Sequence, residues 1–79
     1  MAELYNETLA AYATSDPITV DDNSVIGITS TALIKVYDQS GAYLGEVLQN
    51  GAANIIAVSD EIYIIADAAP ADVVVHGNE

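Results

Sequence analysis

The sequence predicts an all-β fold, a small antiparallel sandwich or barrel of about six strands with an N-terminal arm or short helix. Two observations support this fold class. Short runs rich in Val, Ile and Tyr recur along the chain, and clusters of Asp, Asn, Ser, Gly and Pro separate them at intervals of about ten residues. The first residues differ, because their apolar side chains are spaced three and four positions apart.

The size and composition predict a domain that needs a partner. With 79 residues and no cysteine, the chain can form one domain without disulfides, and a single His leaves no common transition-metal ligand set. Because 52% of the residues are apolar and so small a domain has few interior positions, some apolar surface should contact another chain. We expect a docking arm of residues 1–16, a β domain of residues 17–79, and oligomerisation or docking onto a larger body.

The arm carries four candidate partner-binding side chains: Leu4, Tyr5, Leu9 and Tyr12. Their spacing places the two tyrosines and Leu9 on one side of a short helix. A helix of about twelve residues is marginal alone in water, so this stripe has to pack on something. We interpret the segment as an arm that is helical or extended according to its partner. The alternative is an amphipathic helix that covers the domain's own core.

The β domain is predicted to begin at Pro17, which cannot continue a helix. Apolar and polar residues alternate over residues 18–20, and residues 21–24 form a polar turn cluster. A second strand resumes over residues 25–28, where Gly27 can introduce a bend.

The strongest strand signal is a hairpin over residues 31–48, TALIKVYDQSGAYLGEVL. Residues 38–41 fit a type I turn closed by a left-handed glycine. This turn places Tyr37 opposite Tyr43, and the aromatic pair favours the same register. Continuing that register without interruption places Val36 opposite Leu44, Lys35 opposite Gly45 and Leu33 opposite Val47.

A second hairpin is predicted after a turn at residues 49–51, with strands over residues 54–58 and 62–66, and a last strand covers residues 72–76. The two hairpin strands are apolar on successive residues, so both of their faces should be covered. One face should belong to the core and the other to a neighbouring chain. The predicted oligomer interface is therefore Ile55, Ile56, Val58, Ile62, Tyr63, Ile64 and Ile65.

The charge of −11 narrows the classes of partner. Nucleic acids and anionic membranes are bound mainly by Lys and Arg side chains that neutralise phosphate, and this chain has a single Lys and no Arg. We therefore expect no binding to either. No apolar run is long enough to span a bilayer, and acids stand where a secretory signal carries cations. The carboxylates can serve solubility alone, or they can recognise a basic protein.

The sequence gives little support for catalysis or metal binding, so we expect no enzyme activity, no cofactor and no metal. The Asp21-Asp22 cluster lacks the closing carboxylate of a calcium loop. Asp60 and Glu61 are adjacent, so on a strand they point to opposite faces, and Asp38 is placed to hydrogen-bond its own turn. His76 is the only His, and no Ser or Cys lies next to it in the sequence.

In general build the chain resembles the small virion structural proteins of tailed bacteriophages that decorate or cement a capsid. The resemblance is carried by the segment AELYNETLAAYAT, followed by Pro17, and by the cysteine-free β segment VIGITSTALIKVYDQSGAYLGEVLQNG. It implies an arm that reaches over neighbouring subunits and an outward β domain, often a trimer. By this resemblance the four arm residues would bind the major capsid protein or a similar shell, and the 55–65 region would hold the homo-oligomer together.

The resemblance also implies a location on the capsid surface of a virion, after synthesis in the host cytoplasm. Two other functions remain open. One is an acidic decoy that mimics DNA and inhibits a basic protein, whose binding should weaken steeply as salt rises. The other is an acidic β module of a cellular complex.

Overall fold

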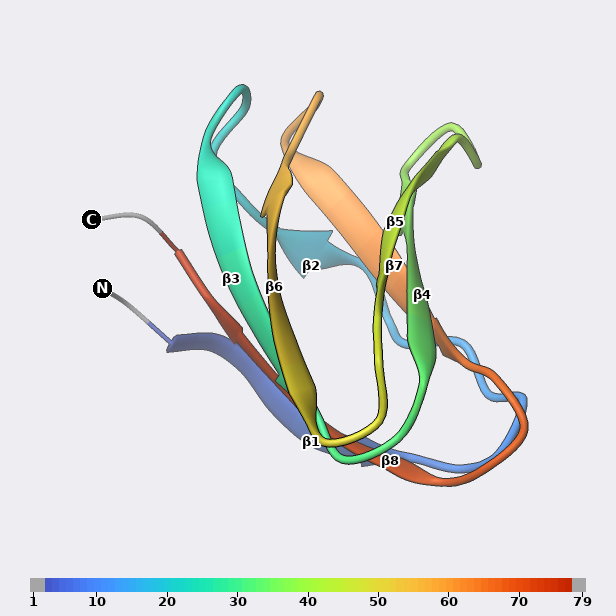
Figure 1. The fold of residues 1–79 in the computed structure, drawn as a ribbon. Helices are drawn as coiled ribbons and strands as arrows, with labels where there is room; N and C mark the ends of the chain where they lie inside the picture. The colour runs from blue at the N-terminus through green and yellow to red at the C-terminus, as the bar shows by residue number, and fades with distance from the viewer. Residues whose placement is uncertain (1–2, 78–79) are drawn as a thin grey trace.

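A computed structural model describes residues 3–77 as two four-stranded antiparallel sheets (Figure 1). The first sheet has the strand order β1-β8-β3-β6 and the second has the order β2-β7-β4-β5. The strands are β1 (Glu3–Leu9), β2 (Ile18–Thr19), β3 (Val25–Ser30), β4 (Ile34–Asp38), β5 (Tyr43–Val47), β6 (Gly51–Ile56), β7 (Glu61–Ala66) and β8 (Ala71–His76). The predicted all-β class is confirmed. Since these residues form no helix, the described part of the chain offers none that could cross a membrane.

Both sheets contribute to one hydrophobic core. Alternate residues of β3, β4, β7 and β8 point inward, as the period of two along a strand requires. The largest fully buried side chains come from the first sheet (Ile26, Ile28, Val73, Val75) and from the second (Ile34, Val36, Val47, Ile62, Ile64). All of them are β-branched, and such side chains pack well on a pleated surface.

The N-terminal segment is a strand, so of the two conformations predicted for the arm the helical one is wrong. β1 pairs antiparallel with β8, in a register that runs from Leu9 opposite Ala71 to Tyr5 opposite Val75. Pairing with β8 covers an edge that would otherwise be open, and a helix this short has too little intrinsic stability to compete. The segment is therefore extended and belongs to the first sheet. Its docking on a partner, and the division of the chain at residue 17, remain predictions.

The predicted hairpin turn is confirmed. The backbone N–H of Gly41 donates to the carbonyl oxygen of Asp38 at 2.8 Å, and Gly41 has a φ of 92°. This left-handed conformation strains any residue with a side chain, so glycine closes the turn. Tyr37 lies opposite Tyr43 as predicted.

Beyond the tyrosine pair the predicted register is wrong by one residue. A β-bulge between Val36 and Tyr37 places Val36 opposite Gly45 and Lys35 opposite Glu46, while Ile34 replaces Leu33 opposite Val47. The extra residue lies on β5, where a bulge sets two residues against one. As a result, the chain's single lysine has a carboxylate directly across the strand pair.

Candidate contact surface

The residues of the predicted oligomer interface alternate between core and surface. Three of them are core residues of this chain: Ile55, Ile62 and Ile64. Their side chains are enclosed by the two sheets, so they cannot contact a neighbour while the domain stays folded. Tyr63 and Ile65 are half-buried on the outer side of the second sheet, whereas Ile56 and Val58 are 61% and 54% exposed. The interface prediction therefore remains open only for these four residues.

The four predicted arm residues do not share a face either. Leu9 is buried in the core and Tyr5 is half-buried against it. Leu4 lies at a β-bulge between Glu3 and Tyr5, and its side chain contacts Gly77 at the cleft beside β2. Tyr12 lies in the loop after β1 and is 74% exposed. The predicted stripe required a helix, so only Tyr12, and Leu4 where it is 36% exposed, remain as apolar candidates for a partner.

A continuous uncharged surface covers the outer side of β3 and β6. It consists of three cross-strand pairs, Val25 with Ile56, Gly27 with Asn54, and Thr29 with Ala52, and of Val58 just beyond β6. We call this surface the β3–β6 face. Its apolar end is well exposed, since Val25 is 43% exposed and its neighbours Ile56 and Val58 more so. In a chain with twelve carboxylates, this face carries none.

Several acidic side chains lie at the opposite edges of both sheets: Glu3, Glu7, Asp16, Glu61 and Asp72. Three others flank the apolar end of the β3–β6 face: Asp21 and Asp22 in the turn before β3, and Asp60 in the loop after β6. The pKa of Tyr5 is raised in the environment of the acidic edges. Burial of the side chain is the main cause, and the nearby carboxylates of Glu7 and Asp16 add to it. Two copies that approach through their β3–β6 faces therefore keep the like charges of these edges apart.

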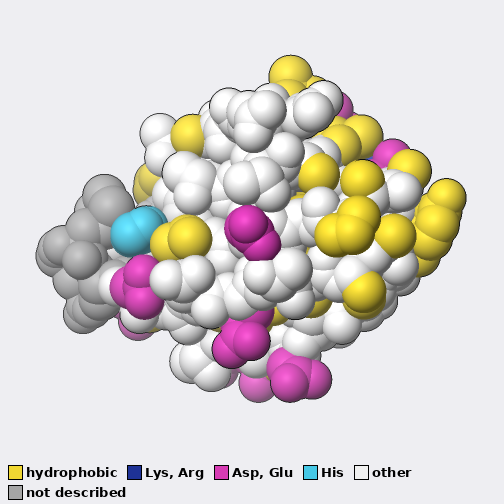
Figure 2. Space-filling view, turned by 90° about the horizontal axis from the view of Figure 1, so that it is seen from below, with side chains coloured by type: hydrophobic (Ala, Val, Ile, Leu, Met, Phe, Trp, Pro, Cys, Tyr) yellow, Lys and Arg dark blue, Asp and Glu magenta, His cyan; other side chains and the backbone are white. Residues whose placement is uncertain are grey.

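A second apolar patch lies where two loops run side by side between the sheets, at residues 10–13 and 67–70 (Figure 1). Figure 2 views the molecule from this end and shows hydrophobic side chains gathered on the side where these loops lie. Tyr12 is the only large side chain of this patch, and the other exposed apolar members are small: Ala10, Ala68, Ala69 and Pro70.

Three tyrosines form a ladder across the outer side of the second sheet. The ring centroids of Tyr37 and Tyr63 are 5.5 Å apart with the rings stacked, and those of Tyr37 and Tyr43 are 5.7 Å apart with an edge contact. The hydroxyl of Tyr43 donates to Glu46 at 3.0 Å. Because the rings contact one another, this ladder covers the sheet within the chain and leaves mainly Tyr43 to the solvent.

Asp38 ties the β4–β5 turn to the β6–β7 loop. The hydroxyl of Ser59 donates to one carboxylate oxygen of Asp38, and the hydroxyl of Ser40 donates to the other at 2.8 Å. These hydrogen bonds, that from Ser59 first, hold the pKa of Asp38 below its ordinary value. The prediction that Asp38 bonds its own turn is confirmed, since the backbone N–H of Ser40 also donates to it.

This network predicts a pH dependence of stability. Because the pKa of Asp38 is lower in the folded state, its ionised form stabilises the fold above the ordinary Asp pKa of about 3.9 and loses this effect as the pH falls through the folded value. Asp38→Asn should therefore lower the melting temperature at pH 7, and its difference from the wild type should shrink below about pH 4. Asp22→Asn, in an exposed turn, is the matched control and should not change the melting temperature. If the difference in melting temperature between Asp38→Asn and the wild type stays constant as the pH falls, this account is contradicted.

The groups considered for chemistry lie apart. Within residues 3–77, no three His, Asp or Glu side chains come close enough to hold a metal ion. Asp21 belongs to a turn in which Ser24 donates to its backbone carbonyl. His76 is half-buried on β8 and has Glu3 and Gly27 directly opposite. None of these groups lies in a cleft with a nucleophile and a base side by side.

Comparison of the chain with protein-family models, with curated proteins and with solved structures finds no match. The uncharged β3–β6 face was itself missed by sequence reasoning. Val25 and Ile56 were both recognised as strand residues, but nothing in the sequence shows that β3 pairs with β6. The only available signal was the absence of charge at alternate positions of the two segments.

Proposed function

We propose that this chain is a non-enzymatic structural protein that self-associates through the β3–β6 face and contributes to a larger protein shell. The observation that carries this proposal is the exposed, uncharged, partly apolar face of Val25, Ile56 and Val58 in a chain of charge −11. Exposed apolar patches rimmed by polar residues are typical of protein contacts. Charge repulsion opposes contact at the acidic edges of the sheets, so this uncharged face is a favourable place for two copies to meet.

Self-association also supplies stability that the chain lacks on its own. A domain of this size buries only about 60–65% of its unfolded surface, and it has no disulfide to restrict the unfolded state. Burying the β3–β6 face in an oligomer stabilises the folded state by mass action. The carboxylates then lie on the outside of the assembly and keep it soluble.

Decoration or cementing of a virion capsid is the form of this function that we propose. It is supported by the resemblance of the N-terminal segment and the cysteine-free β segment to such proteins, and the proposed partner is the major capsid protein. A trimer is the proposed oligomer. We further infer that the two sheets form a sandwich, because β5 and β6 contribute to separate sheets and are not hydrogen-bonded neighbours.

A second candidate function is an acidic decoy that binds a basic protein. The concentration of carboxylates around β1 and β2 favours it, because a decoy needs its charges on one side of the molecule. Its contacts would be made at the edge opposite the β3–β6 face. The two functions therefore predict opposite effects of salt on association.

The proposed function is tested by placing a charge on the face. Ile56→Asp should convert the wild-type oligomer to a monomer in static light scattering, because it buries an unpaired carboxylate in the contact. Gln39→Asp adds the same charge in the exposed β4–β5 turn and should leave the molar mass unchanged. Circular dichroism confirms that both variants are folded. An Ile56→Asp variant that keeps the molar mass of the wild type, or a monomeric wild type, would refute self-association through this face.

A further inference from the structure

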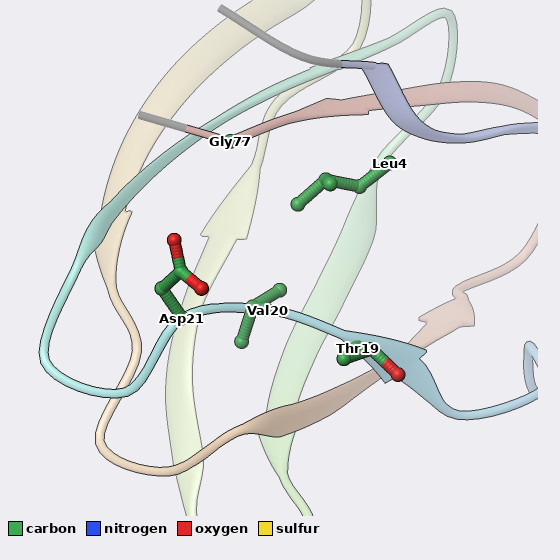
Figure 3. Close-up of a pocket in the computed structure, with 5 residues that line it drawn as sticks. All are labelled: Leu4, Thr19, Val20, Asp21 and Gly77. Atoms are coloured by element: carbon green, nitrogen blue, oxygen red, sulfur yellow. The ribbon is translucent and has the colours of Figure 1, made fainter. Parts of the chain in front are cut away.

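The first strand is held in its sheet by one neighbour only. β1 is the edge strand of the first sheet and pairs with β8 alone. On its other side a cleft of about 150 Å³ separates Leu4 and Gly77 from Thr19, Val20 and Asp21 (Figure 3). Of the seven residues in β1, only Leu9 is buried. Detaching β1 therefore exposes few apolar side chains of the strand itself.

The edge of β8 that β1 covers, here called the slot, fits the side chains of β1 specifically. Val73 and Val75 of β8 are fully buried beneath it, so an empty slot would expose them. The hydroxyl of Thr8 donates to the carboxylate of Asp72 at 2.6 Å. A Cβ atom at Gly77 would lie only 3.1 Å from Cδ1 of Leu4, so glycine lets Leu4 pack closely. A strand of identical sequence is the best occupant of this slot if β1 leaves it.

The loop that follows β1 has the properties of a hinge. Residues 10–13 form one tight turn, in which the N–H of Ala13 donates to the carbonyl oxygen of Ala10 at 3.0 Å. Tyr12 in this turn has a φ of 64°, an unfavourable left-handed conformation for an aromatic residue, and its side chain is mostly exposed. Straightening the turn would release this strain and break few contacts.

The chain is firmly attached immediately after the hinge. The N–H of Ser15 donates to the carbonyl oxygen of Ile64 at 2.7 Å, and the N–H of Ile64 donates to the hydroxyl of Ser15 at 2.9 Å. Ser15 is buried, so this attachment belongs to the interior of the second sheet. A change confined to residues 10–12 can therefore move β1 as a unit while the rest of the domain keeps its structure.

We propose that β1 exchanges between two copies of this chain, so that each copy's β1 pairs with the β8 of the other. The exchanged dimer keeps every β1–β8 contact of the monomer and replaces two strained turns at Tyr12 with two extended hinges. Reciprocal exchange closes into a twofold-symmetric dimer. This contact lies at the edge of the first sheet opposite β6, so it does not depend on the β3–β6 face.

The direct test uses a disulfide between the two strands, since the native chain has no cysteine. Thr8 and Asp72 are directly opposite across β1 and β8, so the Thr8→Cys/Asp72→Cys variant can form this disulfide. After incubation at high protein concentration and high salt, oxidation should give covalent dimers on a denaturing gel. The control pair Lys35→Cys/Glu46→Cys joins β4 to β5, away from β1 and from the β3–β6 face, and should give only monomers. Solely intrachain disulfides in the first variant would overturn the proposal.

A second variant tests the hinge. Tyr12→Gly removes the strain of the closed turn, so it should lower the association constant of the exchanged dimer by about tenfold or more, because each dimer contains two hinges. Asn50→Gly relaxes another left-handed residue, with a φ of 53°, outside the hinge and should leave the constant unchanged. An unchanged constant in Tyr12→Gly would contradict the role of the hinge. A dimer that persists in Ile56→Asp but carries exchanged disulfides would refute the face and support the exchange.

Discussion

Replacing Ile64 with Ala is expected to lower the free energy of unfolding by about 3–4 kcal/mol. Ile64 is completely buried on β7, and it faces the core beside its cross-strand neighbour Val36 of β4. The substitution removes apolar contacts and leaves a cavity that a close-packed core fills only partly. Since domains of this size have total stabilities of about 5–15 kcal/mol, much of the stability would be lost. Urea unfolding followed by circular dichroism measures the change.

The control for this prediction is the same substitution on the surface. Ile56→Ala should change the unfolding free energy of the monomer by no more than about 0.5 kcal/mol, because Ile56 is 61% exposed. Measurements at low protein concentration keep the effect on association separate. Equal losses in the two variants would contradict the assignment of Ile64 to the core and Ile56 to the surface.

Replacing Tyr37 with Ala is expected to lower the free energy of unfolding by about 2–3 kcal/mol. Tyr37 is the middle of the tyrosine ladder, so the substitution removes both ring contacts, each worth about 0.5–1.5 kcal/mol, as well as packing on the sheet. Without Tyr37, no ring connects Tyr63 on β7 to Tyr43 on β5. Thermal and urea unfolding measure this loss.

Tyr12→Ala is the matched control, because Tyr12 lies on an exposed loop outside the ladder. Its unfolding free energy should stay within about 0.5 kcal/mol of the wild type. Tyr37→Leu should recover part of the loss by restoring apolar area without the ring contacts. A Tyr37→Ala variant as stable as the wild type would show that the ladder does not stabilise the second sheet.

Local signals in the sequence were sufficient for the central hairpin. The Asp38–Gly41 turn and the Tyr37–Tyr43 pair follow from residues that are close in the chain, and both were predicted correctly. The register failed beyond Val36 because a bulge on β5 depends on how the strand bends around the core. The residues of the turn alone do not show where such a bulge occurs.

The N-terminal segment shows the limit of periodicity. Its apolar spacing favours a helix, yet Tyr5 and Leu9 also lie on one side of a strand, since Leu9 is the fourth residue after Tyr5 and side chains alternate with a period of two. The choice was decided by β8, which is more than sixty residues away in the sequence and pairs with β1. No local pattern could have shown that this edge needed a partner.

The candidate contact surface was predicted in part. Ile56 and Val58 were expected at an interface and are exposed, whereas Ile55 was expected there and is buried. Successive apolar residues do not reveal which of them points inward. The uncharged face also needs Val25, and its position beside Ile56 follows only from the non-local pairing of β3 with β6.

The most direct test of self-association through an uncharged face is the molar mass of the wild-type protein, measured by light scattering from low to high salt. Screening weakens repulsion between copies of charge −11 and leaves apolar contacts in place, so the oligomer should persist or grow as salt rises. An oligomer that dissociates on addition of salt would show that ion pairs, and not the uncharged face, hold it together. A monomer at every salt concentration would contradict self-association altogether.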